Sequence, residues 1–326
     1  MNLNDLLTIT SLTDSINKLP TVPSVVGSMG LFEEKGIPTT GVTVDEKNGK
    51  LYLIEPISRD ADPEVSEPGD RRARTFETVH LPDTRNIRPS DLQNLRAFGT
   101  ESELTQQAKI INDHLQEMRN AIDATRELLR VGALRGKLVS GKGRVIYDLY
   151  TEFGVQQQRG DLAFSVANTD VRAALVEVSR KIDHKLNGVL VRGKRALCGP
   201  AFFDALTGHP SVQKAYQGYL EGQDKLTADL RKGFTYGGIE FIEYDVMLDG
   251  LRFIPENVAQ IFPVASGIFK MYNAPANYNE AVNTVGKPYY AKTAERKFNK
   301  GWEMEVQSNP LALCLIPEAL FELRAA

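Results

Sequence analysis

The sequence is poor in cysteine and in net charge, and each shortage excludes a class of protein. Its two cysteines, Cys198 and Cys314, are far apart in the chain and belong to no CxxC or Cys/His group. Neither a disulfide framework nor a structural zinc site is therefore indicated, and a reducing place of synthesis fits best. The 39 Lys and Arg against 42 Asp and Glu leave a net charge of −3. This balance argues against a nucleic-acid reader that depends on phosphate contacts.

Long apolar runs are missing as well. Residues 1–20 have no apolar stretch of the length that a signal peptide needs, and no run of 18 apolar residues occurs elsewhere. The sequence therefore predicts a soluble chain without membrane contact. With 42% hydrophobic and 25% charged residues, the composition is that of a globular protein with a real core. The length suits one large domain or two small ones.

The first forty residues lack any uninterrupted pattern. We expect an extended arm over residues 1–41 that buries little of its own surface, because prolines and glycines break it. One short helix is expected inside it, with Ser11 as the cap and Asp14 at its third position. Its apolar stripe needs a partner surface and consists of Leu12, Ile16 and Leu19.

From residue 42 the pattern alternates with a period of two. Val42 and Val44 alternate with polar residues, Asn48-Gly49 suits a type I′ turn, and residues 51–54 are apolar again, which predicts a hairpin. Because a charged stretch follows, the simplest interpretation is a longer two-stranded excursion, with residues 51–57 going out and 74–81 coming back.

The tip of this excursion mixes charges of both signs and cannot form core. We expect it to stand in solvent or to lie over an adjacent subunit, where its charges would make intersubunit contacts. Its charged residues are Arg59, Asp60, Asp62, Glu64, Glu67, Asp70, Arg71, Arg72 and Arg74.

Residues 100–132 carry the strongest helical signal. Thr100 and Glu103 form a capping box, and Gly132 and Gly136 are expected to end the helix. Apolar or small residues follow at alternating steps of four and three. A coiled coil produces such a stripe, and so does a single long helix lying across a sheet; we expect the helix to pack on its own domain's sheet, with the coiled coil as the alternative. The stripe consists of Leu104, Ala108, Ile111, Leu115, Met118, Ile122, Thr125 and Leu129.

The remainder alternates between helical and extended patterns. A helix capped by Thr169 is expected to run to residue 186. Further helices are expected at 201–206 and 211–230, and strands at 144–153, 189–191, 196–198, 239–244, 302–307 and 311–316. The fold class is therefore α+β.

A search for chemistry finds one partial motif. Residues 136–142 match the phosphate-binding pattern G-x-x-x-x-G-K, but Gly143 replaces the hydroxyl that would hold magnesium. A helix precedes these glycines and a strand follows them. A phosphate-binding loop has the opposite order, with the helix after the glycines, so that the helix N-terminus faces the phosphates. An α/β enzyme built around Lys142 is the alternative function that this loop leaves open. No catalytic, cofactor or metal site is otherwise indicated.

The C-terminal third carries a family resemblance in the order and spacing of its turns and strand ends. The motifs are Ile254-Pro255, Phe262-Pro263, Tyr272–Pro275, Glu280–Gly286, Tyr290–Lys292 and Gln307–Leu311. Upstream, Leu81-Pro82, the long helix and the segment Ile182–Leu186 extend the match over most of the chain. Together they resemble the major capsid protein E family of tailed bacteriophages, of the phage lambda type.

The resemblance implies the Hong Kong 97 capsid fold and an organisation into named parts. Residues 1–41 would be the N-terminal arm and 42–98 the extended hairpin called the E-loop. Residues 99–165 would form the peripheral domain with its spine helix, and 166–285 the axial domain. The strands of 286–326 would complete the peripheral domain.

The same resemblance implies a function and partners. The chain would be a structural head protein, synthesised and assembled in the bacterial host cytoplasm, that forms hexamers and pentamers of an icosahedral shell around double-stranded DNA. DNA would be in non-specific proximity rather than a ligand. A separate scaffolding protein is expected because no large helical segment precedes the arm, together with a portal. The residues leave the presence of a decoration protein open.

Overall fold

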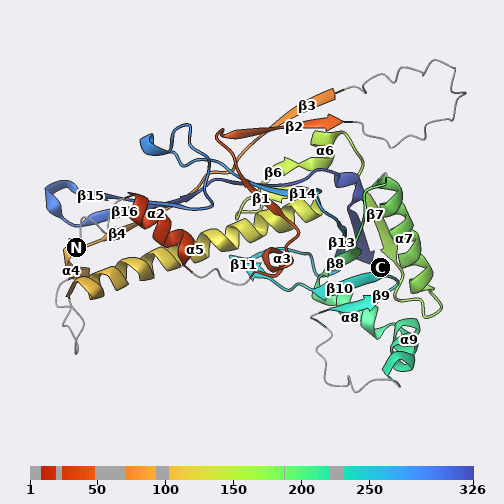
Figure 1. The fold of residues 1–326 in the computed structure, drawn as a ribbon. Coiled ribbons are helices and arrows are strands. Elements are labelled where there is room, and N and C mark those ends of the chain that lie inside the picture. Colours follow the sequence, from red (N-terminus) through yellow and green to blue (C-terminus); the bar gives the residue numbers. More distant parts are fainter. Residues whose placement is uncertain are drawn as a thin grey trace, which may run out of the picture. The chain divides into compact units, whose positions relative to one another are not determined.

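The computed structural model describes residues 9–19, 24–47, 71–92, 103–186, 188–220, 231 and 233–326 (Figure 1). The chain forms two compact units, each assembled from segments that are distant in the sequence. Unit 1 consists of Met1–Val42, Phe76–Arg130 and Phe269–Leu313, and unit 2 consists of Thr43–Thr75, Val131–Ile268 and Cys314–Ala326. Both units combine helices with sheets, which confirms the predicted α+β class.

Unit 1 is built around the long helix α5 (Glu103–Arg135), drawn in yellow in Figure 1, whose last residues, from Val131 on, belong to unit 2. Its apolar stripe packs against an antiparallel sheet of order β15-β16-β4, with bounds Tyr290–Glu295, Trp302–Ser308 and Leu81–Ile87. The prediction of a helix lying on its own domain's sheet is thus confirmed. The shared core contains Ile111, Leu115, Met118 and Ile122 of the helix with Ile87, Ala291, Met304 and Val306 of the sheet.

The ends of α5 differ partly from expectation. Gly132 lies inside the helix, which ends at Arg135, and Gly136 follows with a φ of 73°. Only Gly136 has the left-handed conformation that ends a helix without steric cost to a side chain. The predicted capping residue Thr100 lies outside the described residues.

The N-terminal segment packs more extensively than the sequence suggested. Helix α2 (Ile9–Lys18) buries Leu12 and Ile16 in the same core as α5, and Leu19 packs at its edge. The helix begins at Ile9, so Ser11 lies inside it and does not cap it. The expectation that this segment buries little of its own surface is therefore wrong, since its apolar stripe finds a partner surface within unit 1.

A second sheet of unit 1 also takes in the N-terminal segment. Strand β1 (Glu33–Gly36) pairs in parallel with β14 (Phe269–Asn273), whose other neighbour is β17 (Pro310–Cys314). Two short helices, α3 (Val25–Ser28) and α4 (Pro89–Leu92), also precede α5 in the chain. Cys314 and Cys198 are both free and buried.

Unit 2 is built around a six-stranded mixed sheet of order β7-β18-β13-β8-β10-β9. Three helices accompany the sheet: α7 (Val171–Lys185), α8 (Pro200–Gly208) and α9 (Pro210–Leu220). The strands, in the same order, are Gln158–Leu162, Phe321–Ala325, Val258–Val264, Gly193–Cys198, Ile239–Glu243 and Phe234–Tyr236.

Three local expectations for unit 2 need correction. The predicted strand 144–153 is a strand, β6 (Val145–Asp148), followed by a helix, α6 (Leu149–Phe153), because the Asp148 carboxylate accepts hydrogen bonds from the N–H groups of that helix's first turn. Helix α7 is capped by Asp170 rather than by Thr169. The apolar run 189–191 forms no strand, and the Leu190 side chain is 85% exposed.

Two-stranded sheets and the short 3-10 helices η2 (Asn279–Ala281), η3 (Lys297–Asn299) and η4 (Pro317–Ala319) are also present. Strand β5 (Lys137–Val139) pairs with β6, and β11 (Met247–Leu248) pairs with β12 (Leu251–Arg252). Strand β2 (Gly41–Lys47) pairs with β3 (Arg71–Glu77), and we call this pair the ribbon. The turn predicted at residues 48 and 49 and the strand predicted at 51–57 lie outside the described residues.

Candidate assembly contacts

Three of the nine predicted intersubunit residues fall on the ribbon. Arg71, Arg72 and Arg74 belong to β3, although the side chains of the first two lie outside what the structure describes. The other predicted contact residues, outside the described residues, are Arg59, Asp60, Asp62, Glu64, Glu67 and Asp70.

Arg74 does not project freely from the ribbon. Its Nη2 donates a hydrogen bond of 3.2 Å to the carbonyl oxygen of Phe153. Its guanidinium also lies 5.2 Å from the centre of the Phe153 ring, within the range of a cation–π interaction. Arg74 thus holds the ribbon to α6 inside unit 2.

The loop around Lys142 does not have the shape of a phosphate site. Residues 136–142 run from the end of α5 through β5 into the turn of the β5–β6 hairpin. Within that turn the Gly143 N–H donates to the Ser140 carbonyl oxygen at 2.8 Å, so this amide is already used by the turn itself. No helix begins at the glycines, and the feature that would hold an anion there is therefore missing from this described segment.

Other classes of site are not seen in the described residues. Across those ranges, no group of three or more His, Cys, Asp or Glu side chains is arranged to hold a metal ion. No helix in the described part of the chain is long and apolar enough to cross a membrane.

A second stripe of α5, made of charged residues, is buried beside the apolar one. The Arg126 side chain, 1% exposed, donates from Nη1 to Asn273 Oδ1 at 2.8 Å and to Ser308 Oγ at 3.1 Å. Its Nη2 reaches the Glu34 carboxylate at 3.2 Å. One arginine thus joins α5 to β1, β14 and β16. Such charge-assisted bonds are stronger than neutral ones, and they fix direction as well as distance.

The same stripe binds the N-terminal helices. Arg119 Nη1 donates to the carbonyl oxygens of Ile16 and Leu19, the latter at 2.6 Å, and so completes the C-terminal end of α2. About two turns further along α5, Glu127 accepts hydrogen bonds from the N–H groups of Val26 at 2.7 Å and Gly27 at 3.2 Å, at the start of α3.

Tyr289 connects the two halves of this stripe. Its hydroxyl donates to Asp123, and its ring lies 4.6 Å from the guanidinium carbon of Arg119 and 5.2 Å from that of Arg126. Burial raises the pKa of Tyr289 to about 12, so the hydroxyl keeps its proton and remains a donor at neutral pH. We call Arg119, Asp123, Arg126, Glu127 and Arg130, with the partners named above, the charged stripe.

Nothing in the sequence pattern singled out the charged stripe. Its residues are spaced by three and four positions, which is the usual pattern of a solvated helix face. One signal was available: Asn273 and Ser308, which accept hydrogen bonds from Arg126, both lie in motifs that carry the family resemblance.

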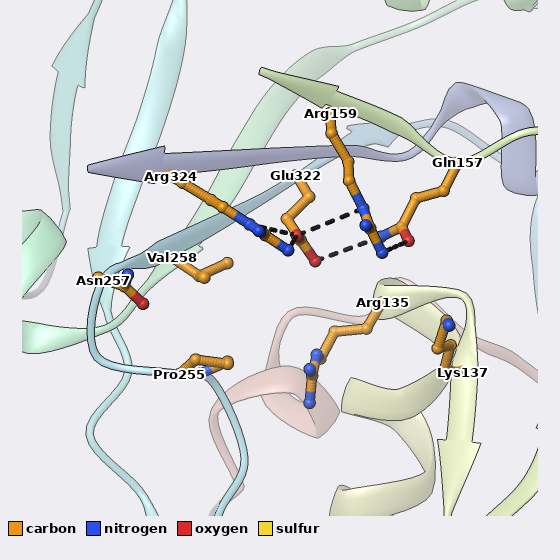
Figure 2. Close-up of a pocket in the computed structure, with 9 residues that line it drawn as sticks. All are labelled: Arg135, Lys137, Gln157, Arg159, Pro255, Asn257, Val258, Glu322 and Arg324. Carbon is orange, nitrogen blue, oxygen red and sulfur yellow. Dashed lines mark hydrogen bonds and ion pairs between the residues drawn. The ribbon is translucent and has the colours of Figure 1, made fainter. Parts of the chain in front are cut away.

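Unit 2 contains a pocket of about 360 Å³ lined by several basic side chains (Figure 2). Arg135, in the last turn of α5, and Lys137 lie on one side, and strands β7 and β18 supply the other side with Arg159, Glu322 and Arg324. We call these five residues and the space between them the arginine pocket.

Glu322, the single acid of the arginine pocket, is already paired with neighbouring side chains. Glu322 accepts hydrogen bonds from Arg324 Nη2 at 2.8 Å and from Gln157 Nε2 at 3.2 Å, and Arg159 Nε lies 3.6 Å from it. Lys137 pairs with Asp148 at 2.9 Å. Arg135 donates to the carbonyl oxygen of Phe253 at 3.0 Å. The pocket therefore contains more positive than negative charge.

Comparison with known proteins gives a consistent result. The family model described as phage major capsid protein E matches residues 8–325. With 97% of its length, the chain aligns at 27% identity to 96% of the major capsid protein of Salmonella phage Felix O1 (isolate Felix O1-VT1). It aligns at 28% identity, over the same shares, to the major capsid protein of Pseudomonas phage KPP10.

Solved structures show a similar fold at low identity. A putative capsid protein of an E. coli CFT073 prophage matches with a TM-score of 0.60 and 14% identity, over 98% of this chain and 99% of that one. The capsid of cyanophage P-SCSP1u matches with a TM-score of 0.54 and 12% identity, over 94% and 90%. The mature capsid of bacteriophage PhiM1 gives 0.52 and 10%, over 95% and 89%.

Proposed function

Because this chain belongs to the phage major capsid protein E family, we propose that it self-assembles as hexamers and pentamers into an icosahedral shell around double-stranded DNA. A member of this family is a structural protein, many copies of which build a phage capsid, and the chain is therefore not an enzyme. Its fold is the predicted Hong Kong 97 capsid fold. The alternative of an enzyme around Lys142 has no support.

The observation that carries the proposal is the match of one family model to nearly the whole chain, residues 8–325. A match of that extent includes both compact units, so neither unit stands outside the family as a separate catalytic domain. The charged stripe supports the same proposal in physical terms, because a shell subunit must keep one shape in many copies, and directional buried bonds favour one arrangement.

We propose that the named parts of the fold keep the boundaries expected from the sequence. The N-terminal arm is 1–41, the E-loop 42–98, the peripheral domain 99–165 with strands from 286–326, and the axial domain 166–285. The ribbon lies in the proposed E-loop. Strand β18 pairs with β13 of the proposed axial region, so the C-terminal strands contribute to both units.

The partners follow from the family in the same way. We propose assembly in the bacterial host cytoplasm on a separate scaffolding protein, with a portal in the shell and packaged DNA in non-specific proximity. We also propose that the charged segment 59–74 lies over an adjacent copy. Each copy would repeat the contact around a closed shell, so that small energies sum through symmetry.

Electron microscopy of particles purified from cells that express the full chain tests the proposal. We expect closed shells with fivefold and sixfold clusters, alone or after a scaffolding protein is supplied. Lys142→Ala should form the same particles, because the loop is a hairpin turn. Specific nucleotide binding at micromolar affinity that Lys142→Ala abolishes, without particles under either condition, would contradict the proposal.

A further inference from the structure

The charges that line the arginine pocket are unbalanced. Its four cations are Arg135, Lys137, Arg159 and Arg324. The acids that pair with them are Glu322 and Asp148. Two acids against four cations leave two positive charges without a carboxylate inside one cavity.

Arg135 is the least compensated of the four cations. Within the described part of the chain it makes no ion pair, and the partner recorded for its guanidinium is the neutral carbonyl oxygen of Phe253. Burial lowers the pKa of Arg135, and Glu322 across the pocket offsets this only in part. An enclosed charge without a counterion raises the free energy of the folded state. Binding an anion beside that charge would lower it again.

The geometry suits a small anion with several oxygens. Arg135 and Arg159 line the pocket from opposite sides, Arg135 at the end of α5 and Arg159 on β7 (Figure 2). A guanidinium offers five N–H donors in a planar fork that matches the oxygens of phosphate, and Arg135 uses one nitrogen for Phe253. The cavity of about 360 Å³ is within the range of small-ligand sites.

We propose that the arginine pocket binds an oxyanion of the phosphate class between Arg135 and Arg159. The anion supplies the negative charge that the surrounding protein lacks and joins the end of α5 to the β7–β18 edge of the sheet. This site belongs to the single subunit, so the proposal stands apart from the proposed shell.

Thermal unfolding of the purified full-length subunit tests this site. The melting temperature is measured against inorganic phosphate, with sodium chloride adjusted to constant ionic strength. We expect a saturable rise of about 2–4 °C at ten times the dissociation constant. Arg135→Gln should remove the rise. The matched control is Arg144→Gln, an exposed arginine beside β6 and outside the pocket, which should retain it.

A second variant keeps the test valid if Arg135→Gln does not fold. The Arg159 side chain is 51% exposed, so Arg159→Gln should fold and should weaken phosphate binding in isothermal titration calorimetry. Titration with a short oligothymidylate distinguishes the source of the phosphate. Tighter binding than inorganic phosphate, lost in the same variants, assigns the site to nucleic-acid phosphates, and weaker binding assigns it to a free ion. The absence of saturable binding by either, or equal binding by wild type and both pocket variants, overturns the proposal.

Discussion

The two buried stripes of α5 differ in how far they could be predicted. The apolar stripe, with Ile111 and Leu115, is visible in the sequence because apolar residues at helical spacing have few alternatives to burial. The charged stripe, with Arg126 and Glu127, has the same spacing and is buried just as well, but charged residues at that spacing are ordinarily solvated. The difference shows that periodicity locates a face, whereas burial of charge depends on partners that come from distant segments.

The largest expected effect tests the apolar stripe. Ile111→Asp places a charge without a partner against β4, β15 and β16 and should cost several kcal/mol of unfolding free energy, most of a domain's stability. Urea unfolding followed by circular dichroism measures it. The control is Lys109→Asp, on an exposed side of the same helix, which should cost little. An Ile111→Asp chain that folds normally and only fails to self-associate would favour the coiled-coil alternative.

The next effect tests whether the N-terminal helix belongs to this core. Ile16 is fully buried in the cluster that contains the apolar stripe, so Ile16→Ala should destabilise the subunit by about 2–5 kcal/mol through lost packing and a cavity. Lys18→Ala, exposed on the same helix, is the control. Equal urea midpoints for the two variants would restore the interpretation of residues 1–41 as an extended arm that buries little of its own surface.

The charged stripe should be somewhat less sensitive. Arg126→Met removes the donor for Glu34, Asn273 and Ser308, and we expect a cost of about 1–3 kcal/mol, reduced from that of a fully buried pair because the Glu34 side chain is 39% exposed. A double-mutant cycle with Glu34→Gln measures the coupling. Additive costs in this cycle would show that the stripe is not an interacting network.

The contribution of Glu34 to the stability of the charged stripe should depend on pH. Burial is the largest single influence and raises the pKa of Glu34. Arg126 and Arg130 together lower this pKa by more than burial raises it, so the net pKa lies below the ordinary value of 4.5. The folded pKa is thus below the unfolded one, so the added stability is complete above pH 4.5 and is lost as the pH falls through the folded pKa. The gap in urea midpoint between wild type and Glu34→Gln should narrow in acid. A gap that is constant from about pH 3 to 6 would contradict this.

The smallest effect on subunit stability concerns charges expected to find partners in another copy. Arg71→Glu with Arg72→Glu should leave urea unfolding of the subunit unchanged, since exposed pairs contribute about 0–1 kcal/mol each. Shell yield should fall, and salt should weaken the wild-type shell in the same direction. The control is Arg144→Glu. Unchanged yield and salt tolerance in the double variant would show that residues 59–74 face solvent.

Local signals in the sequence determined much of the secondary structure. The stripe of α5, the alternation of Trp302, Met304 and Val306 in β16, and the glycine after Arg135 each act within a few residues, so a pattern reports them directly. The order and spacing of the motifs also identified the family. Errors occurred where a local signal was ambiguous, as at Asp148, whose carboxylate starts a helix inside an apparently extended run.

Only the tertiary structure decided which of these elements are partners. The apolar run 189–191 has the composition of a strand and forms none, because a strand needs a neighbour and, among the described residues, none pairs with it. Arg126 is buried because Glu34, Asn273 and Ser308 arrive from three separate segments, and Arg135 lines a pocket because β7 and β18 lie opposite it. The sequence shows that a charge needs a polar partner and that an apolar run needs an apolar neighbour. Which segment supplies that partner or neighbour depends on the three-dimensional fold.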